Sequence, residues 1–343
     1  MEIQNNINLK KYNTFKISSI AKYFCEIKSA NDILELIESD VYQENKKYFL
    51  GSGANTIFVN DYQWLVIKNN ILWKEIISQD NEKVQIRVWA GEAWTDFVVR
   101  CANKNLVWME NLAFVPSSVW ATAVQNLWAY GVESKDIIKT VEWVNLETKE
   151  TRILDAKECN FGYRDSIFKN DLKNKFIITH VAYEFKKFNN DYKFNTEYRW
   201  ISEKISEMWF DENNLKPSEF VEAITEIRKA KLPDREKIWT AGSFFKNPVV
   251  SESEWDRLQK EHPELKWFEV EDGVKLSAGQ LIDMCGFKWQ NDGKVGTYKN
   301  HALILVNEWP ANGQDVKNFA NQIQEKVKNK FWISLYPEAI FVE

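Results

Sequence analysis

The sequence predicts an α+β fold of two or three domains, and three observations lead to this expectation. Strand-like and helix-like hydrophobic patterns are mixed along the chain. The chain has 343 residues, of which 44% are apolar, and it is longer than the ~100–200 residues of one typical domain. Asn, Asp, Lys and Glu dominate residues 186–216, which we interpret as an inserted surface excursion followed by a linker, with a domain break near residues 186–232.

Two helices and several strands are expected before this tract. Ser29 precedes an apolar helical face and has Asp32 three residues later, which is typical of a capped helix start. A second, short helix is expected from Thr95 to about Lys104. Strands are expected at residues 48–50, 56–59, 65–67, 84–88, 176–178 and 181–183, and most of 140–185 is strand-like.

The clearest helical patterns follow the tract. Pro217 stands where a first helical turn tolerates proline, and the apolar face behind it ends before Pro233. The last helix has apolar residues at i, i+3, i+4, i+7 and i+11, namely Val316, Phe319, Ala320, Ile323 and Val327. A final pair of strands at residues 302–307 and 333–342 is expected to flank it.

Charge and composition argue against several classes of protein. The net charge is −5 with no long basic block, so a nucleic-acid partner is not expected. The first residues do not have the pattern of a secretory signal, and no apolar run approaches the ~18–20 residues of a membrane span. The four cysteines and three histidines lack metal-ligand spacing, so we expect no metal and a reducing cytoplasm.

Two segments are suited to binding a ligand through the backbone. In Leu50–Thr56, small residues between two strands let N–H groups converge on a pyrophosphate, although an ordinary turn is the alternative. The segment lacks the Gly-x-Gly-x-x-Gly spacing of a Rossmann site. Met109–Gly131 mixes small, amide and hydroxyl side chains without a clear period, which favours a functional loop over a packed element.

Three further segments each present one reactive side chain. Residues 161–166 form a compact turn with Arg164, for which a surface ion pair with Asp165 is the alternative. Residues 241–248 place Ser243 beside a glycine, as a proton donor or as a local hydrogen-bonding group. Residues 335–338 place Glu338 in an otherwise apolar terminal strand, where it is either exposed at an edge or retained for function.

Taken in order, these segments resemble the UDP-N-acetylenolpyruvoylglucosamine reductases of peptidoglycan synthesis over nearly the whole chain. Residues around 195–205, with Tyr198, resemble a tyrosine-bearing loop that one branch of this family has. The matching motifs are Tyr12–Phe15, Gly51–Asn55, Glu110–Ala113, Gln125–Asn126, Ala129–Gly131, Phe161–Ser166, Lys231–Asp234, Gly242–Pro248 and Pro337–Glu338.

The resemblance implies a particular fold and reaction. The fold would be an FAD-binding fold of the vanillyl-alcohol-oxidase type in two subdomains, residues 1–68 and 69–214, with an inserted loop at about 188–214. A substrate-binding domain would follow at residues 215–343. The reaction would be the reduction of UDP-N-acetylglucosamine enolpyruvate to UDP-N-acetylmuramate, with bound FAD and with NADPH as hydride donor, by a cytoplasmic monomer.

The implied reaction gives each matched side chain a role. Negative charge develops on the carboxylate side of the substrate, and Arg164 together with a protonated Glu338 would stabilise it. Ser243 would donate a proton to the neighbouring carbon. The FAD-binding positions would be Gly51, Ser52, Gly53, Ala54, Asn55, Pro116, Ser117, Ser118, Trp120, Gln125, Asn126, Ala129 and Ile177. The substrate-binding positions would be Tyr163, Tyr198, Lys231, Asn247, Lys288 and His301.

Two other functions compete with this interpretation. A related FAD-dependent oxidase of another alcohol or lactone would share the flavin fold, although the matches at Arg164, Ser243 and Glu338 argue against it. A non-catalytic protein is the other alternative, because indoles occupy the loop that is expected to bind the flavin.

Tryptophan is unusually abundant, with 16 residues against 12 glycines, whereas average proteins contain ~7% glycine. Overpacking costs ~1–3 kcal/mol per site, so many Gly→Trp replacements would exceed the ~5–15 kcal/mol stability of a typical fold. Our hypothesis is that a UGA codon encodes glycine in the source lineage and is translated here as tryptophan. The family has glycine at Trp64, Trp89, Trp108, Trp120, Trp128, Trp239, Trp289, Trp309 and Trp332, whereas Trp94 matches a family aromatic residue.

Overall fold

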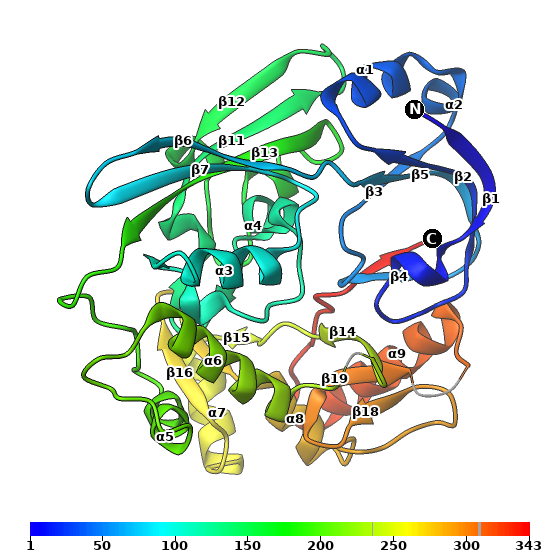
Figure 1. The fold of residues 1–343 in the computed structure, drawn as a ribbon. Coiled ribbons are helices and arrows are strands. Elements are labelled where there is room, and N and C mark those ends of the chain that lie inside the picture. The colour runs from blue at the N-terminus through cyan, green and yellow to red at the C-terminus, as the bar shows by residue number, and fades with distance from the viewer. Residues whose placement is uncertain (235, 308–309) are drawn as a thin grey trace. The chain divides into compact units, whose positions relative to one another are not determined.

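The chain folds into two compact units, each built from separate stretches of sequence. Residues 1–5, 23–52 and 64–230 form the first unit, and residues 6–22, 53–63 and 231–343 form the second. The computed structural model describes residues 1–234, 236–307 and 310–343, so Trp309 lies outside the described residues (Figure 1). Both units mix helices and strands, which confirms the predicted α+β class.

An antiparallel sheet of order β12–β11–β13–β7–β6 forms the centre of the first unit. Val84, Ile86 and Val88 are buried between less buried neighbours, which confirms the predicted alternation. The strands are β6 (Lys74–Gln79), β7 (Lys83–Trp89), β11 (Ile138–Asn145), β12 (Thr151–Asp155) and β13 (Phe176–Lys187), and β8 (Leu106–Val107) pairs with the end of β13.

Two helices of the first unit, α3 (Trp94–Ala102) and α4 (Val119–Gln125), pack on this sheet (Figure 1). The helix predicted at about 95–104 is confirmed by α3. The prediction of a loop over 109–131 was wrong for α4, because Val119, Thr122 and Ala123 are buried at i, i+3 and i+4. A short hairpin of β9 (Trp128–Ala129) and β10 (Val132–Glu133) follows.

Helices α5 (Arg199–Glu207) and α6 (Pro217–Lys231) complete the core of the first unit. Most of residues 186–216 are exposed or half-buried, as a surface excursion would be, but this tract also contains the unpredicted helix α5, whose Ile201 and Ile205 are buried. Phe194 also stacks on Phe220 of α6 with 4.7 Å between ring centroids. One apolar pair at i and i+4 lies on a single helix face and is enough to attach α5 to the core. The predicted start of α6 at Pro217 is confirmed.

A second sheet has the order β1–β2–β5–β3. Its strands are β1 (Ile3–Asn8), β2 (Ile20–Ile27), β3 (Lys47–Leu50) and β5 (Tyr62–Asn69), of which β3 and β5 are parallel. Helices α1 (Ala30–Glu38) and α2 (Asp40–Glu44) follow β2. The predicted cap of α1 is confirmed, since Ser29 Oγ accepts a hydrogen bond from the Asp32 N–H and the Asp32 carboxylate accepts one from the Ser29 N–H.

The described residues of the second unit form three small sheets and three α-helices. The last predicted helix is confirmed as α9 (Gly313–Phe331), whose apolar stripe is buried. The sheets are β14 (Trp239–Ser243)–β19 (His301–Asn307)–β18 (Gly296–Tyr298), β15 (Val249–Val250)–β17 (Gly273–Leu276)–β16 (Trp267–Val270), and β20 (Ile340–Val342) parallel to β4 (Thr56–Phe58). The other helices are α7 (Glu252–Glu261) and α8 (Ala278–Met284).

The strand predicted at 333–342 forms only over its last three residues, as β20. Ile333 and Leu335 are buried between exposed neighbours, so buried and exposed residues do alternate as in a strand. The segment before β20 makes only an isolated bridge between Phe245 and Pro337, and proline has no N–H to continue a ladder. None of the helices in the described ranges is long and apolar enough to cross a membrane.

Candidate active site

Ser243 lies at a bulge in strand β14 of the second unit. The pairing with β19 shifts between Thr240 and Ser243, so β14 carries one extra residue there. Gly242 accommodates it with φ 76°, and the Thr240 hydroxyl accepts a hydrogen bond from the Gly242 N–H at 3.0 Å. Because bulges re-aim side chains and Ser243 is exposed, its hydroxyl is accessible to a ligand.

Glu338 is held beside this bulge by main-chain hydrogen bonds. Its N–H donates to the carbonyl of Phe244, the residue after Ser243, at 2.8 Å. The Glu338 carbonyl accepts a hydrogen bond from Asn55 Nδ2 at 2.9 Å. The second unit therefore brings together three of the predicted site residues, Asn55, Ser243 and Glu338.

The Gly51–Asn55 loop joins β3 to β4 as the expected strand-to-strand turn. Gly53 has φ 68°, and a Cβ atom there would lie 2.0 Å from the Tyr12 carbonyl oxygen, so only glycine fits. The Gly53 carbonyl accepts a hydrogen bond from the Thr14 N–H at 3.2 Å. Gly51 and Ser52 belong to the first unit, whereas Gly53, Ala54 and Asn55 belong to the second.

Ser118 faces Gly51 within the first unit. A Cβ atom on Gly51 would lie 3.3 Å from Ser118 Oγ and 3.8 Å from Cδ1 of Trp120. The Ser118 hydroxyl is buried and has no hydrogen-bond partner among the described residues, which is costly unless a ligand supplies one. The Trp120 indole stacks on Phe176 with 5.3 Å between ring centroids and narrows the space beside Gly51.

The turn that carries Arg164 is attached to the end of α4. Gly162 and Asp165 exchange main-chain hydrogen bonds of 3.1 and 3.3 Å, and Arg164 between them has φ 56°. Asn126 Nδ2 donates to the Gly162 carbonyl at 2.9 Å, and Asn126 Oδ1 accepts from the Lys135 N–H at 3.0 Å. The Asn126 side chain thus fixes the backbone around Arg164.

Arg228 belongs to the same region, although the sequence analysis missed it. Its Nε donates to the Phe114 carbonyl at 3.1 Å, and its guanidinium lies over the Tyr130 ring, 5.8 Å from the centroid. Burial lowers the pKa of Arg228, and the nearby charge of Arg164 also lowers it. An anion bound near both guanidinium groups would relieve this repulsion. Arg228 follows Ile224 by four residues on the apolar face of α6, which is the signal that could have revealed it.

Two tyrosines adjoin this pair of arginines. The rings of Tyr130 and Tyr198 pack edge to face with 5.7 Å between centroids. Tyr198 is the residue just before α5, so the helix that was missed in the sequence positions it. Burial raises the pKa of both phenols, which therefore stay protonated and able to donate hydrogen bonds at neutral pH. Tyr163, beside Arg164, is half exposed.

A cationic group in the second unit combines three predicted substrate-binding residues. Burial lowers the pKa of His301, and the charges of Lys231 and Lys288 lower it further. The Leu303 N–H donates to Nδ1 of His301 at 3.3 Å, so the neutral ring carries its proton on Nε2. Lys288 also pairs with Asp283 at 3.6 Å. This group is suited to a phosphate or diphosphate.

The remaining predicted positions lie in packed parts of the two units. Asn247 Oδ1 accepts a hydrogen bond from the Ala278 N–H at the start of α8, at 3.0 Å. Among the described residues no group of three or more His, Cys, Asp or Glu side chains is placed to hold a metal ion. Pro116 and Ser117 precede α4, Gln125 ends it, Ala129 lies in β9, and Ile177 is fully buried in β13.

Comparison with known proteins first defines the class. Residues 21–155 match a family described as an FAD binding domain, and residues 233–342 match the C-terminal domain of UDP-N-acetylenolpyruvoylglucosamine reductase. Together with the mixed sheet-and-helix architecture, these matches define an FAD-dependent oxidoreductase. The predicted FAD-binding fold and FAD cofactor are thereby confirmed.

Relatives then identify the family. The chain is 40% identical over 339 residues to the UDP-N-acetylenolpyruvoylglucosamine reductase of Flavobacterium johnsoniae, covering 98% of this chain and 99% of that protein. It is 34% identical over 344 residues to the reductase of the same name from Chromobacterium violaceum, covering 100% and 99%. The chain belongs to the UDP-N-acetylenolpyruvoylglucosamine reductase family.

Solved structures agree on the fold. The UDP-N-acetylenolpyruvylglucosamine reductase of Thermus caldophilus superimposes with a TM-score of 0.68 at 21% identity, and all of both chains is covered. The Physcomitrella patens protein BBE-like 1 superimposes with a TM-score of 0.51 at 11% identity, covering 99% of this chain and 89% of that one. At these identities the matches support the architecture alone.

The residues around the Gly51–Asn55 loop leave room for an FAD cofactor beside Ser118, but Trp120 crowds it. Gly51 leaves room beside the Ser118 hydroxyl, which lacks a partner within the described residues and is free to bind a polar group of a ligand. Trp120 takes up part of this room. The polar groups thus suit the cofactor, whereas the Trp120 indole crowds it.

Proposed function

We propose that this protein reduces UDP-N-acetylglucosamine enolpyruvate to UDP-N-acetylmuramate, with NADPH as hydride donor. The relatives that match nearly the whole chain carry the corresponding reductase name, which supports this proposal. Bound FAD would supply the hydride transfer between NADPH and the enolpyruvyl double bond. We assign FAD binding to residues 1–68 and 69–214 and substrate binding to residues 215–343, in keeping with the two family matches.

The observation that carries the proposal is the hydrogen bond between the Glu338 N–H and the carbonyl of the residue after Ser243. Reduction of a double bond conjugated to a carboxylate needs stabilisation of the developing negative charge and a proton for the adjacent carbon. We assign the proton donation to the Ser243 hydroxyl. The Glu338 carboxyl group and the Arg164 guanidinium would stabilise the charge.

Cationic groups would bind the anionic parts of the substrate. The group formed by Lys231, Lys288 and His301 would hold the diphosphate, because both lysine charges are near enough to lower the pKa of His301 and would attract an anion there. Arg228 would assist Arg164 at a second anionic group. The phenol of Tyr198 would donate to a phosphate oxygen, which would place this chain in the branch with the tyrosine loop.

Separate measurement of the two half-reactions tests these roles. In Ser243→Ala, flavin reduction by NADPH should continue, whereas flavin reoxidation by the enolpyruvyl sugar nucleotide should slow by about 10²–10⁴-fold. Ser334→Ala, a substitution at an exposed serine of the same unit, should leave both rates unchanged. Normal reoxidation in Ser243→Ala would contradict the assigned role. Oxygen consumption with a simple alcohol, without turnover of the sugar nucleotide, would instead favour an oxidase.

We further propose that the protein acts as a monomer in the cytoplasm. Its four cysteines are free thiols, and three of them are buried, as is common in proteins of reducing compartments. Sedimentation velocity of the flavin-loaded protein should give a single species of monomer mass. A concentration-independent dimer would contradict this.

A further inference from the structure

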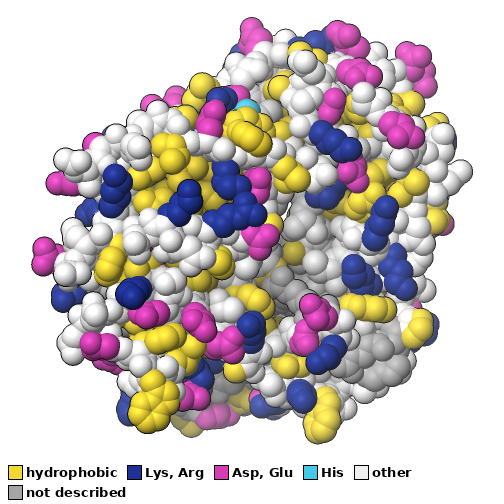
Figure 2. Space-filling model, in the orientation of Figure 1, with side chains coloured by type: hydrophobic (Ala, Val, Ile, Leu, Met, Phe, Trp, Pro, Cys, Tyr) yellow, Lys and Arg dark blue, Asp and Glu magenta, His cyan; other side chains and the backbone are white. Residues whose placement is uncertain are grey.

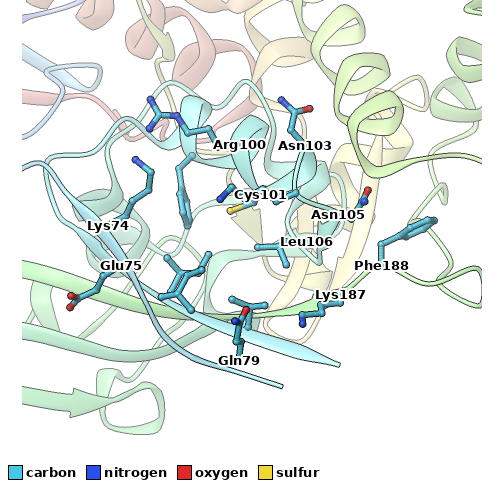
Figure 3. Close-up of a pocket in the computed structure, with 15 residues that line it drawn as sticks. Lys74, Glu75, Gln79, Arg100, Cys101, Asn103, Asn105, Leu106, Lys187 and Phe188 are labelled. Atoms are coloured by element: carbon cyan, nitrogen blue, oxygen red, sulfur yellow. The ribbon is translucent and has the colours of Figure 1, made fainter. Parts of the chain in front are cut away.

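A cavity of about 1000 Å³ opens in the first unit between the β6–β7 hairpin and helix α3 (Figure 3). Its floor is apolar and consists of buried side chains, among them Ile86, Phe97 and Leu106. The exposed Ile76 on edge strand β6 extends this apolar wall to the surface, with 53% of its area accessible. The volume is at the upper end of the ~300–1,000 Å³ that small-molecule pockets span.

The rim of this cavity is cationic. Lys74, Arg100, Lys104 and Lys187 contribute four positive charges, whereas Glu75 contributes the one negative charge among the lining residues. Glu75 is already paired with Arg87 at 3.2 Å, outside the lining. Figure 2 shows apolar side chains beside a group of Lys and Arg side chains in this region.

Two of the rim cations have unused binding capacity. The Arg100 guanidinium and the Lys104 ammonium make no ion pair or hydrogen bond within the described part of the chain. Lys74, by contrast, lies 4.0 Å from Glu92, and Lys187 donates to the Asp80 carbonyl at 2.6 Å. Two uncompensated cations at the mouth of an apolar cavity are complementary to an anionic head on an apolar body.

None of the residues assigned to the flavin or substrate site lines this cavity, and none of the tryptophans does. The thiol of Cys101 in its floor is inert, because burial raises the pKa of Cys101 to about 12. The cavity therefore contains no reactive group. Its lining also stays the same whether or not the tryptophans are native, because no tryptophan lines it.

We propose that this cavity is a binding site for a fatty carboxylate, distinct from the reductase site. The acyl chain lies against Ile76, Ile86 and Phe97, and the carboxylate contacts Arg100 and Lys104. Burial of several methylene groups supplies most of the affinity. The two cations supply the selectivity for a charged head over a neutral one.

Titration calorimetry of the flavin-loaded full chain with decanoate, below its micelle concentration, tests this proposal. Decanoate should bind saturably at one site, and decanol should bind about tenfold more weakly because it lacks the charge. The double variant Arg100→Gln/Lys104→Gln should bind decanoate about tenfold more weakly than the parent and should bind decanol with unchanged affinity. Reductase activity should be unaffected in that variant.

A second variant acts on the apolar wall instead of the charges. Ile76→Glu places a negative charge where the acyl chain of decanoate would lie, and it should abolish decanoate binding. Because Ile76 is exposed, the substitution should not disturb folding. The matched controls are Ile153→Glu on the exposed face of β12 and Arg199→Gln on α5, which should bind decanoate normally. Absence of saturable decanoate binding, or equal affinity in the parent, the double variant and Ile76→Glu, would overturn the proposal.

Discussion

Among the tryptophans that the structure describes, four have a backbone conformation that suits glycine. Trp108, Trp209, Trp289 and Trp332 have φ angles of 104°, 62°, 56° and 63°, and a bulky residue is rare there. Trp332 is the C-cap of α9, and Trp209 follows the end of α5, where glycine is the usual residue. Trp108, Trp289 and Trp332 are among the positions where the resemblance implies glycine, whereas Trp209 was not assigned to that group. The positive φ angles at these positions support the codon hypothesis.

Trp332→Gly should stabilise the protein. The left-handed conformation costs about 1–2 kcal/mol for an L-residue, whereas a new glycine costs about 0.5–1 kcal/mol in chain entropy. Because the Trp332 side chain is 78% exposed, little packing is lost, and a net gain of up to about 1.5 kcal/mol is expected. Urea unfolding measures it. Trp200→Gly, inside α5, should destabilise by about 1 kcal/mol, and a loss of similar size in Trp332→Gly would contradict the account.

Glu110 is the buried carboxyl group with the clearest pH consequence. It is 2% exposed, its Oε2 accepts from the Trp108 N–H at 2.8 Å, and Oε1 has no partner in the described residues. Burial raises the pKa of Glu110 to about 7, from an ordinary value of 4.5. The folded state therefore holds more protons than the unfolded state between these two values, and stability falls as pH rises through this window.

The loss of stability between pH 4.5 and 7 that is due to Glu110 should be about 3 kcal/mol. Glu110→Gln should remove this slope and make the protein more stable than the parent at pH 8. Unfolding midpoints in urea across this range measure the effect, with the exposed Glu222→Gln as control. An unchanged pH profile in Glu110→Gln would show that this carboxyl group does not carry the linkage.

At the scale of elements, helix α4 and the loop before it determine whether the flavin fits. Trp120 in the first turn of α4 crowds Gly51 and the unsatisfied Ser118 hydroxyl. Trp120→Gly should raise FAD affinity, since removal of about 1–3 kcal/mol of overpacking corresponds to roughly fivefold to more than a hundredfold in Kd. Flavin released per mole of denatured protein measures this. Trp73→Gly, at a side chain 64% exposed, should not change flavin content, and equal content in both variants would argue against the crowding.

The elements that the sequence predicts well are those whose signals are local. The capping box at Ser29 and Asp32 and the long stripe of α9 each specify a helix without help from the rest of the fold. Helix α5 and the segment at 333–339 were mispredicted for a different reason. Helix α5 contributes Ile201 and Ile205 to a core cluster that also contains Phe220, and the other segment loses its ladder at Pro337. These outcomes depend on tertiary partners that periodicity does not contain.

The residues of the candidate site were also predicted only in part. The motifs around Ser243 and Glu338 could be found in the sequence, but the hydrogen bond that joins their segments is set by the register of residues 244–246 against 336–338. Arg228 was missed because its helix was interpreted as apolar core. Arg228 follows Ile224 by four residues and therefore lies on the apolar face of its helix. A search for charged residues on apolar helix faces would have found it.

For the whole molecule, the codon hypothesis makes a direct prediction about covalent structure. The protein isolated from its source organism should be lighter than the printed sequence requires, by an integral number of Trp-to-Gly differences. Peptide mapping should place glycine at the positions with positive φ, Trp108, Trp209, Trp289 and Trp332. An intact mass that agrees with 16 tryptophans would contradict the hypothesis.

The central claim is that this protein is a flavin-dependent reductase of an enolpyruvyl sugar nucleotide. The natively expressed protein should be yellow and release FAD on denaturation. Its oxidation of NADPH should depend on UDP-N-acetylglucosamine enolpyruvate and yield UDP-N-acetylmuramate in equal amounts. The most direct test is therefore anaerobic NADPH oxidation by this protein, measured with and without that substrate. A stoichiometric, substrate-dependent rate is predicted, and a flavin-loaded protein that oxidises no NADPH in its presence would contradict the account.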